Sequence, residues 1–164
     1  MSPQLLARHV EDRFKGRVGR AWRTIVDAVA AGAVPHHTFH VFAVYPWLGL
    51  LRTGVVDEPL SVLDRCRTTP ALVERVDGET VTALAPSLRW DGRLLTLGPW
   101  ERRRAGFGQD GLAFVSPQPG DWVSLHWDFV CDRLTFAQAR TLQRANERAL
   151  AAVNRSATSS RALA

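Results

Sequence analysis

Lysine is almost missing from this sequence: Lys15 is its only lysine, so nearly all of its 21 basic residues are arginine. The formal net charge of +5 would ordinarily indicate an acidic partner. However, the densest basic cluster, residues 102–104 (RRR), opens a stretch with three glycines, and adjacent like charges are typical of a solvated loop. The charge therefore does not by itself predict a nucleic-acid interface.

Long apolar runs and cysteine pairs are also missing. The longest apolar stretch, residues 41–51, is shorter than the roughly 20 residues that a membrane span needs. The first residues lead directly into polar and charged ones, unlike a secretory signal. We therefore expect a cytoplasmic protein, whose two cysteines, Cys66 and Cys131, are free thiols, buried residues or ligands and not a structural disulfide. Neither belongs to a CxxC pair, so a zinc finger is not indicated.

The chain divides into three regions by pattern. Residues 1–63 show apolar positions at helical spacing and are predicted to be helical. Residues 64–154 are predicted to form a small β-barrel closed by a C-terminal helix, and residues 155–164 are small and polar enough to be a disordered tail. The fold class predicted is therefore α+β, an OB-like barrel preceded by a helical region.

The barrel prediction rests on turn signals between short β-type runs. Asp77-Gly78 and Asp91-Gly92 each lie between such runs and predict two hairpins. Residues 102–111 are predicted to be a loop, and residues 112–115 and 122–129 to be two further strands. Thr135 and Gln138 form a capping box that opens the closing helix, which we expect to end near Asn154 and to pack through Phe136, Ala139 and Leu142.

The predicted strand 122–129 contains the first candidate site residue. Alternation places Val123, Leu125, Trp127 and Phe129 on the core face and turns His126 outward. A surface histidine hydrogen-bonded to Asp128 is the simpler interpretation of His126. By the same parity, Cys131 is expected in the core.

Cys66 is the second candidate, at the start of the barrel. Its neighbours Arg65 and Arg67 would favour the thiolate, which is the form that ligates metals or acts as a nucleophile. The simpler interpretation is an inert buried cysteine. Three histidines, His36, His37 and His40, suggest a metal site, since His36 and His40 lie four residues apart on a predicted helix. They have no acidic or cysteine partner nearby in sequence, so we expect them instead to start and pack a helix. The apolar face with Phe39, Phe42 and Trp47 is expected to pack on the barrel or to bind a partner.

Two motifs resemble the HypC/HupF family of nickel-iron hydrogenase maturation chaperones. The first is Cys66 with Pro70 four residues later, followed by residues 72–78 (LVERVDG), which resemble the Cys-xxx-Pro and first hairpin of that family. The second is residues 120–126 (GDWVSLH) followed by Phe129, which resemble its Gly-Asp-aromatic-Val-x-Val-His segment. The resemblance extends from residue 66 to about 153. Arg133 and Leu134 resemble the basic-aliphatic pair of that family, and Ala139 lies at the start of the matching closing helix.

The resemblance implies a small OB-like barrel that is not an enzyme. It implies that Cys66 and His126 are metal ligands for a transient iron fragment bearing cyanide and carbon monoxide. The partners implied are a HypD-like maturation scaffold and the precursor of the hydrogenase large subunit. A thiolate and an imidazole are suitable donors for such a fragment and leave it transferable to a site with more ligands.

Two other classes of function compete with this hypothesis. Small barrels often bind single-stranded nucleic acid, and the chain is basic with six tryptophans, but the predicted strands interleave aromatic and basic residues only at Arg89, Trp90 and Arg93. An enzyme would use Cys66 as a nucleophile and His126 as its base. No residue that would orient His126 and no oxyanion motif is recognisable, so the enzyme ranks last.

Overall fold

The computed structural model describes residues 3–14, 21–30, 36–43, 47–109 and 111–159. Five helices come first: α1 (Pro3–Phe14), α2 (Ala21–Ala30), α3 (His37–Ala43), α4 (Trp47–Arg52) and α5 (Asp57–Cys66). Seven strands follow, and the long helix α6 (Phe136–Ser159) ends the described chain. The strands are β1 (Thr69–Asp77), β2 (Thr80–Trp90), β3 (Leu95–Gly106), β4 (Gly108–Gln109), β5 (Leu112–Ala113), β6 (Trp122–His126) and β7 (Phe129–Leu134). The mixed α+β class is thus confirmed.

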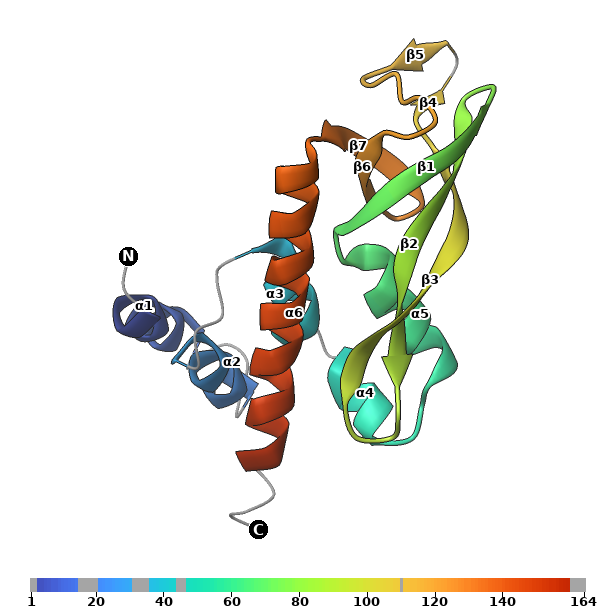
Figure 1. The fold of residues 1–164 in the computed structure, drawn as a ribbon. Coiled ribbons are helices and arrows are strands. Elements are labelled where there is room, and N and C mark those ends of the chain that lie inside the picture. The colour runs from blue at the N-terminus through green and yellow to red at the C-terminus, as the bar shows by residue number, and fades with distance from the viewer. Residues whose placement is uncertain (1–2, 15–20, 31–35, 44–46, 110, 160–164) are drawn as a thin grey trace.

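Five strands form one sheet in the order β1-β2-β3-β7-β6, and β6 pairs back with β1. The pairing is antiparallel except between β3 and β7, which meet in parallel at Gly106 and Phe129. Strands β4 and β5 form a separate two-stranded ribbon that projects from the sheet (Figure 1). The OB-like geometry expected for this sheet stays a prediction.

The two aspartate-glycine hairpins are confirmed. Asp77-Gly78 connects β1 to β2, Asp91-Gly92 lies between β2 and β3, and both glycines have positive φ angles of 58° and 93°. Such turns need left-handed backbone, which glycine adopts without a steric penalty. The predicted loop at 102–111 is wrong, because β3 continues through the three arginines to Gly106. Two of these side chains pair with carboxylates, Arg102 with Glu74 and Arg103 with Asp64, so the run of like charge does not force a loop.

Three clusters of buried side chains hold the fold together. One cluster draws on all five strands of the sheet. A second joins α1, α2 and α3 to α6 through Ala7, Ile25, Val29, Phe39 and Ala152. The third links α3, α4 and α5 to β2, β3 and α6, with the fully buried Phe42, Leu51, Leu63 and Leu95 among its members. The helical region and the sheet therefore share a core.

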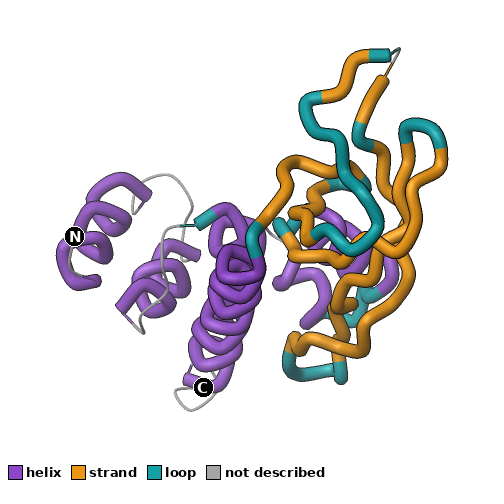
Figure 2. The backbone as a smooth tube through the Cα atoms, turned by 45° about the horizontal axis from the view of Figure 1, so that its top comes forward, coloured by secondary structure: helices purple, strands orange, loops and turns teal. Residues whose placement is uncertain are grey.

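Helix α6 stands between α1 and α2 on one side and the strands on the other (Figures 1 and 2). Its capping box is confirmed, since the Gln138 amide donates to the Thr135 hydroxyl at 3.2 Å and the Thr135 amide donates to the Gln138 side chain at 2.7 Å. Ala139 is buried as expected, but Leu142 is only half-buried and Phe136 is 60% exposed. The burial comes further along the helix, at Ala149, Leu150 and Val153, where it crosses the third cluster.

The C-terminal end of the chain differs from the prediction. The closing helix does not end near Asn154 but continues to Ser159, so residues 155–159 are helical and not a disordered tail. Residues 160–164 lie outside the described residues. Among the residues that are described, no helix is both long and apolar enough to cross a membrane.

Candidate metal site

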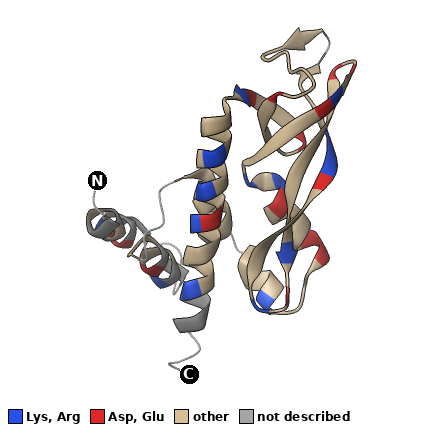
Figure 3. Cartoon of the chain, viewed as in Figure 1, with Lys and Arg blue, Asp and Glu red and all other residues tan. Residues whose placement is uncertain are grey.

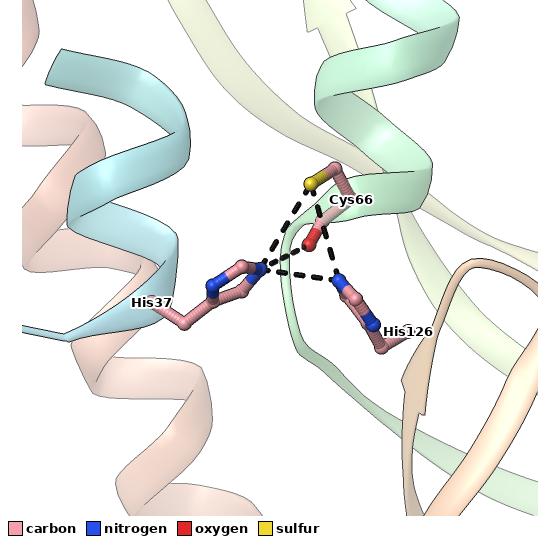
Figure 4. Close-up of side chains that lie close together, drawn as sticks. All are labelled: His37, Cys66 and His126. Carbon is pink, nitrogen blue, oxygen red and sulfur yellow. Dashed lines mark hydrogen bonds between the residues drawn. The ribbon is translucent and has the colours of Figure 1, made fainter. Parts of the chain in front are cut away.

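Three side chains that could ligate a metal ion meet where α3 begins and where α5 and β6 end (Figure 4). His37 is the first residue of α3, Cys66 is the last residue of α5, and His126 is the last residue of β6. The ligand atoms of the three residues all lie within 4.8 Å of one another. Each side chain is placed by the way in which its own element starts or stops.

His36 caps the N-terminus of α3 and thereby sets the position of His37. The His36 ring nitrogen Nδ1 accepts a hydrogen bond from the Thr38 amide at 3.1 Å, as a polar N-cap side chain does. Burial, and next the neighbouring His37, lower the pKa of His36 and so favour the neutral ring that this bond requires. The expectation that these histidines start the helix is right for His36. His37 has a further role, because its exposed side chain faces the other two donors.

Helix α5 ends at Cys66 because the next residue becomes extended. Arg67 has φ −65° and ψ 139°, and its amide closes the last turn on the Leu63 carbonyl. The Arg67 side chain is fully buried and turns into the protein towards Asp64. Cys66 therefore lies at the end of a helix and not on a barrel strand as predicted, with only 5% of its surface exposed.

A tight turn sets the position of His126. The predicted single strand 122–129 is in fact two, since Trp127 and Asp128 form a turn between β6 and β7. Val123 and Leu125 are buried as predicted, but Trp127 is 43% exposed and does not belong to the core. The same change of direction shifts the parity of β7, which leaves Cys131 exposed instead of buried. His126 itself is half-buried.

The hydrogen bonds define the protonation state of the site. Nε2 of His37 lies 2.9 Å from the Cys66 carbonyl oxygen and 3.1 Å from Nε2 of His126. A carbonyl only accepts, so the metal-free geometry is consistent with a proton on His37 Nε2. Ligation of a metal by this nitrogen requires the neutral ring to carry its proton on Nδ1 instead. The Cys66 sulfur lies 3.9 Å from each of the two nitrogens.

These distances match what a bound metal ion would require. Bonds of about 2.3 Å to sulfur and about 2.0 Å to nitrogen, at tetrahedral angles, separate the two nitrogens by roughly 3.3 Å and the sulfur from each nitrogen by roughly 3.5 Å. The observed values are 3.1 Å and 3.9 Å. Small side-chain rotations that shift these atoms by a few tenths of an ångström would complete a coordination shell of one sulfur and two nitrogens, with a fourth position open.

The pKa shifts of the two predicted ligands imply that binding of a metal ion is coupled to loss of a proton. Burial, and next the neighbouring His37, lower the pKa of His126, so its imidazole is neutral near pH 7. Burial raises the pKa of Cys66, although a hydrogen bond from the Trp127 side chain acts in the opposite direction. The expectation that Arg65 and Arg67 favour the thiolate is not supported, because both guanidinium groups are paired with aspartates. A metal ion would have to displace the thiol proton.

The structure brings together both predicted ligands, Cys66 and His126, and adds His37, for which the sequence favoured a packing role. His37 lies 29 and 89 positions away from them along the chain, beyond the reach of any local pattern. The predicted partner-binding residues have a different role. Phe42 is buried in the third cluster and Trp47 packs against it, so packing that includes the sheet accounts for both. Phe39 is buried in the second cluster, among helices alone.

A family model matches residues 1–160, almost the whole chain. The protein belongs to this family, DUF6390, a family of unknown function. No curated protein and no solved structure matches it.

Proposed function

We propose that this protein binds a transition metal ion, or a metal fragment, through His37, Cys66 and His126, and acts as an accessory protein in metal-centre assembly. The observation that carries the proposal is the convergence of three donor atoms from three different elements within 4.8 Å. A buried thiol and two imidazoles on a shared core form a built site, and one open position suits a cargo that must later leave.

The family resemblance supports a more specific version of this role. Cys66 and His126 are the two residues that match the ligands of HypC/HupF chaperones, and the Cys66 sulfur lies 3.9 Å from Nε2 of His126. We propose that the five-stranded sheet is the OB-like barrel of that family, and that the cargo is an iron fragment bearing cyanide and carbon monoxide. The partners would be a HypD-like scaffold or a hydrogenase large-subunit precursor. On this proposal the protein is not an enzyme.

The test is anaerobic purification of the full chain from a hydrogenase-producing host. We expect substoichiometric iron, infrared bands from cyanide and carbon monoxide, and copurification of the scaffold or the large-subunit precursor. His126→Ala should remove the bands, whereas His40→Ala, which changes an exposed histidine on the same helix as His37, should retain them. A wild-type protein with neither iron nor partner would contradict the hydrogenase role.

Single-stranded nucleic-acid binding keeps one supporting observation. Trp100 and Phe136 are exposed, Trp122 lies between them with ring centroids at 5.9 Å and 6.0 Å, and Arg140 lies over Phe136. Stacking sites need such aromatics. Against this, basic and acidic positions are interspersed along α5 and the strands (Figure 3), and several form ion pairs. Salt-dependent binding of a random oligonucleotide, lost in Trp100→Ala, would favour this second function.

The enzyme alternative is disfavoured by the environment of Cys66. A cysteine nucleophile needs a lowered pKa, and burial raises that of Cys66. The His126 nitrogen that would act as its base already accepts a hydrogen bond from His37.

A further inference from the structure

The turn that carries His126 has an unfavourable sequence for its backbone. Trp127 and Asp128 have φ angles of 50° and 59°, both in the left-handed region. A two-residue hairpin turn of this type strongly prefers Asn-Gly, and a bulky tryptophan is disfavoured there. Backbone held in such a conformation persists only where surrounding contacts stabilise it.

Those contacts come from Arg65, the residue before Cys66. The Trp127 amide donates to the Arg65 carbonyl at 2.8 Å. The Arg65 guanidinium pairs with the Asp128 carboxylate at 2.5 Å and lies 5.4 Å from the centre of the Trp127 ring. The Trp127 side chain in addition lies near the Cys66 thiol. We call Arg65, Trp127 and Asp128 together the clasp.

The clasp joins the two ends of the site that carry its predicted ligands. Arg65 adjoins Cys66 in the last turn of α5, and Trp127 adjoins His126 at the end of β6. The Arg65 and Asp128 side chains are 46% and 43% exposed, and ion pairs at such positions contribute little to stability. The turn is strained and its side-chain contacts are exposed, so it adds little to stability. Its presence is better explained by the positions that it gives to His126 and Cys66.

We propose that Arg65, Trp127 and Asp128 are positioning residues of the metal site, which hold the His126 nitrogen and the Cys66 sulfur at coordinating distance and orient the sulfur. This inference rests on the proposed function. Residues around the ligands of a metal site typically change its affinity by about 10–100-fold when they are lost. Trp127 is the natural donor to the metal-bound sulfur, because its indole N–H can donate but not accept.

The experiment titrates the full chain with Co²⁺ and follows the thiolate-to-cobalt charge-transfer absorption. Arg65→Met retains the alkyl stem without the charge, Trp127→Phe retains the ring without the N–H, and Asp128→Asn suits the left-handed backbone. The control is Glu101→Gln, which breaks the comparably exposed Arg89–Glu101 pair between β2 and β3. All variants are also melted without metal.

We expect Arg65→Met and Trp127→Phe to weaken Co²⁺ binding by about 10–100-fold with little change in Tm. Trp127→Phe should also shift the charge-transfer band, and Glu101→Gln should change neither. If the clasp variants bind Co²⁺ like the control, or lose affinity only in proportion to lost Tm, the positioning role is wrong while the metal site stands. If the wild type shows no charge-transfer band, the proposed function fails and this inference with it.

Discussion

Asp64 offers the sharpest test of how the helix that carries Cys66 is held. Its carboxylate lies between two guanidinium groups, accepting from Arg67 at 2.9 Å and 3.1 Å and from Arg103 at 2.5 Å. The Arg67 side chain is 0% exposed, and it also donates to the Thr69 hydroxyl at 2.9 Å and to the Pro86 carbonyl. Burial lowers the pKa of Arg67 and the Asp64 charge acts against that shift, so the carboxylate compensates a buried cation.

Asp64→Asn should therefore destabilise the protein by about 3–5 kcal/mol, because it leaves the buried Arg67 charge without its counter-charge. In a chain of this size that corresponds to a fall in Tm of roughly 10 °C. Urea denaturation at neutral pH measures it, and Glu101→Gln at the exposed Arg89 pair should cost less than about 1 kcal/mol.

A double variant separates charge from packing. Asp64→Asn with Arg67→Met removes both charges, and we expect it to be more stable than Asp64→Asn alone, since the neutral pair avoids the buried unpaired cation. A loss below about 1 kcal/mol for Asp64→Asn would refute the reasoning. So would a double variant as unstable as the sum of the two single ones.

Four further predictions concern pH, packing and the second cysteine. Because burial lowers the pKa of His36 and His126, the unfolded chain binds more protons, so metal-free stability should fall as pH drops below about 6.5. The raised pKa of Cys66 should make it fall again as pH rises above the ordinary value of 9.0, and a flat urea midpoint at both ends would contradict this. Phe42→Ala should cost about 3–5 kcal/mol in urea denaturation, because that ring is 1% exposed, and a near-neutral result would show the core to be loose. Cys131→Ala, at an exposed position, should leave both Tm and Co²⁺ affinity unchanged, and lower affinity would make Cys131 a ligand.

Local chemistry determined what the sequence could predict. Asp77-Gly78, Asp91-Gly92 and the Thr135 capping box were predicted correctly because each depends on a few adjacent residues. The turn at Trp127 and Asp128 was missed for the same reason: it lacks the residues that such turns prefer and depends on Arg65, which is distant in the sequence.

The candidate site was also predicted only in part, because its three residues are brought together by contacts between distant parts of the chain. Cys66 and His126 were found through a family resemblance, and the elements that carry them were partly misplaced, since Cys66 ends a helix and His126 precedes a turn. His37 was not chosen as a ligand, because no acidic or cysteine residue accompanies it nearby in sequence and its partners Cys66 and His126 come from distant parts of the chain. Burial of Phe39 and Phe42 beside it is what brings α3 to the site. Packing of that kind has no local signature.

X-ray absorption spectroscopy of the full chain loaded with one equivalent of Zn²⁺ would identify the ligands of the bound ion. We expect a first shell with one sulfur at about 2.3 Å and two imidazole nitrogens at about 2.0 Å, with the remaining position filled by a light atom from solvent. His37→Ala should lose one imidazole and retain the sulfur. A first shell without sulfur, or one whose imidazole count is the same in His37→Ala, would contradict the three-residue site.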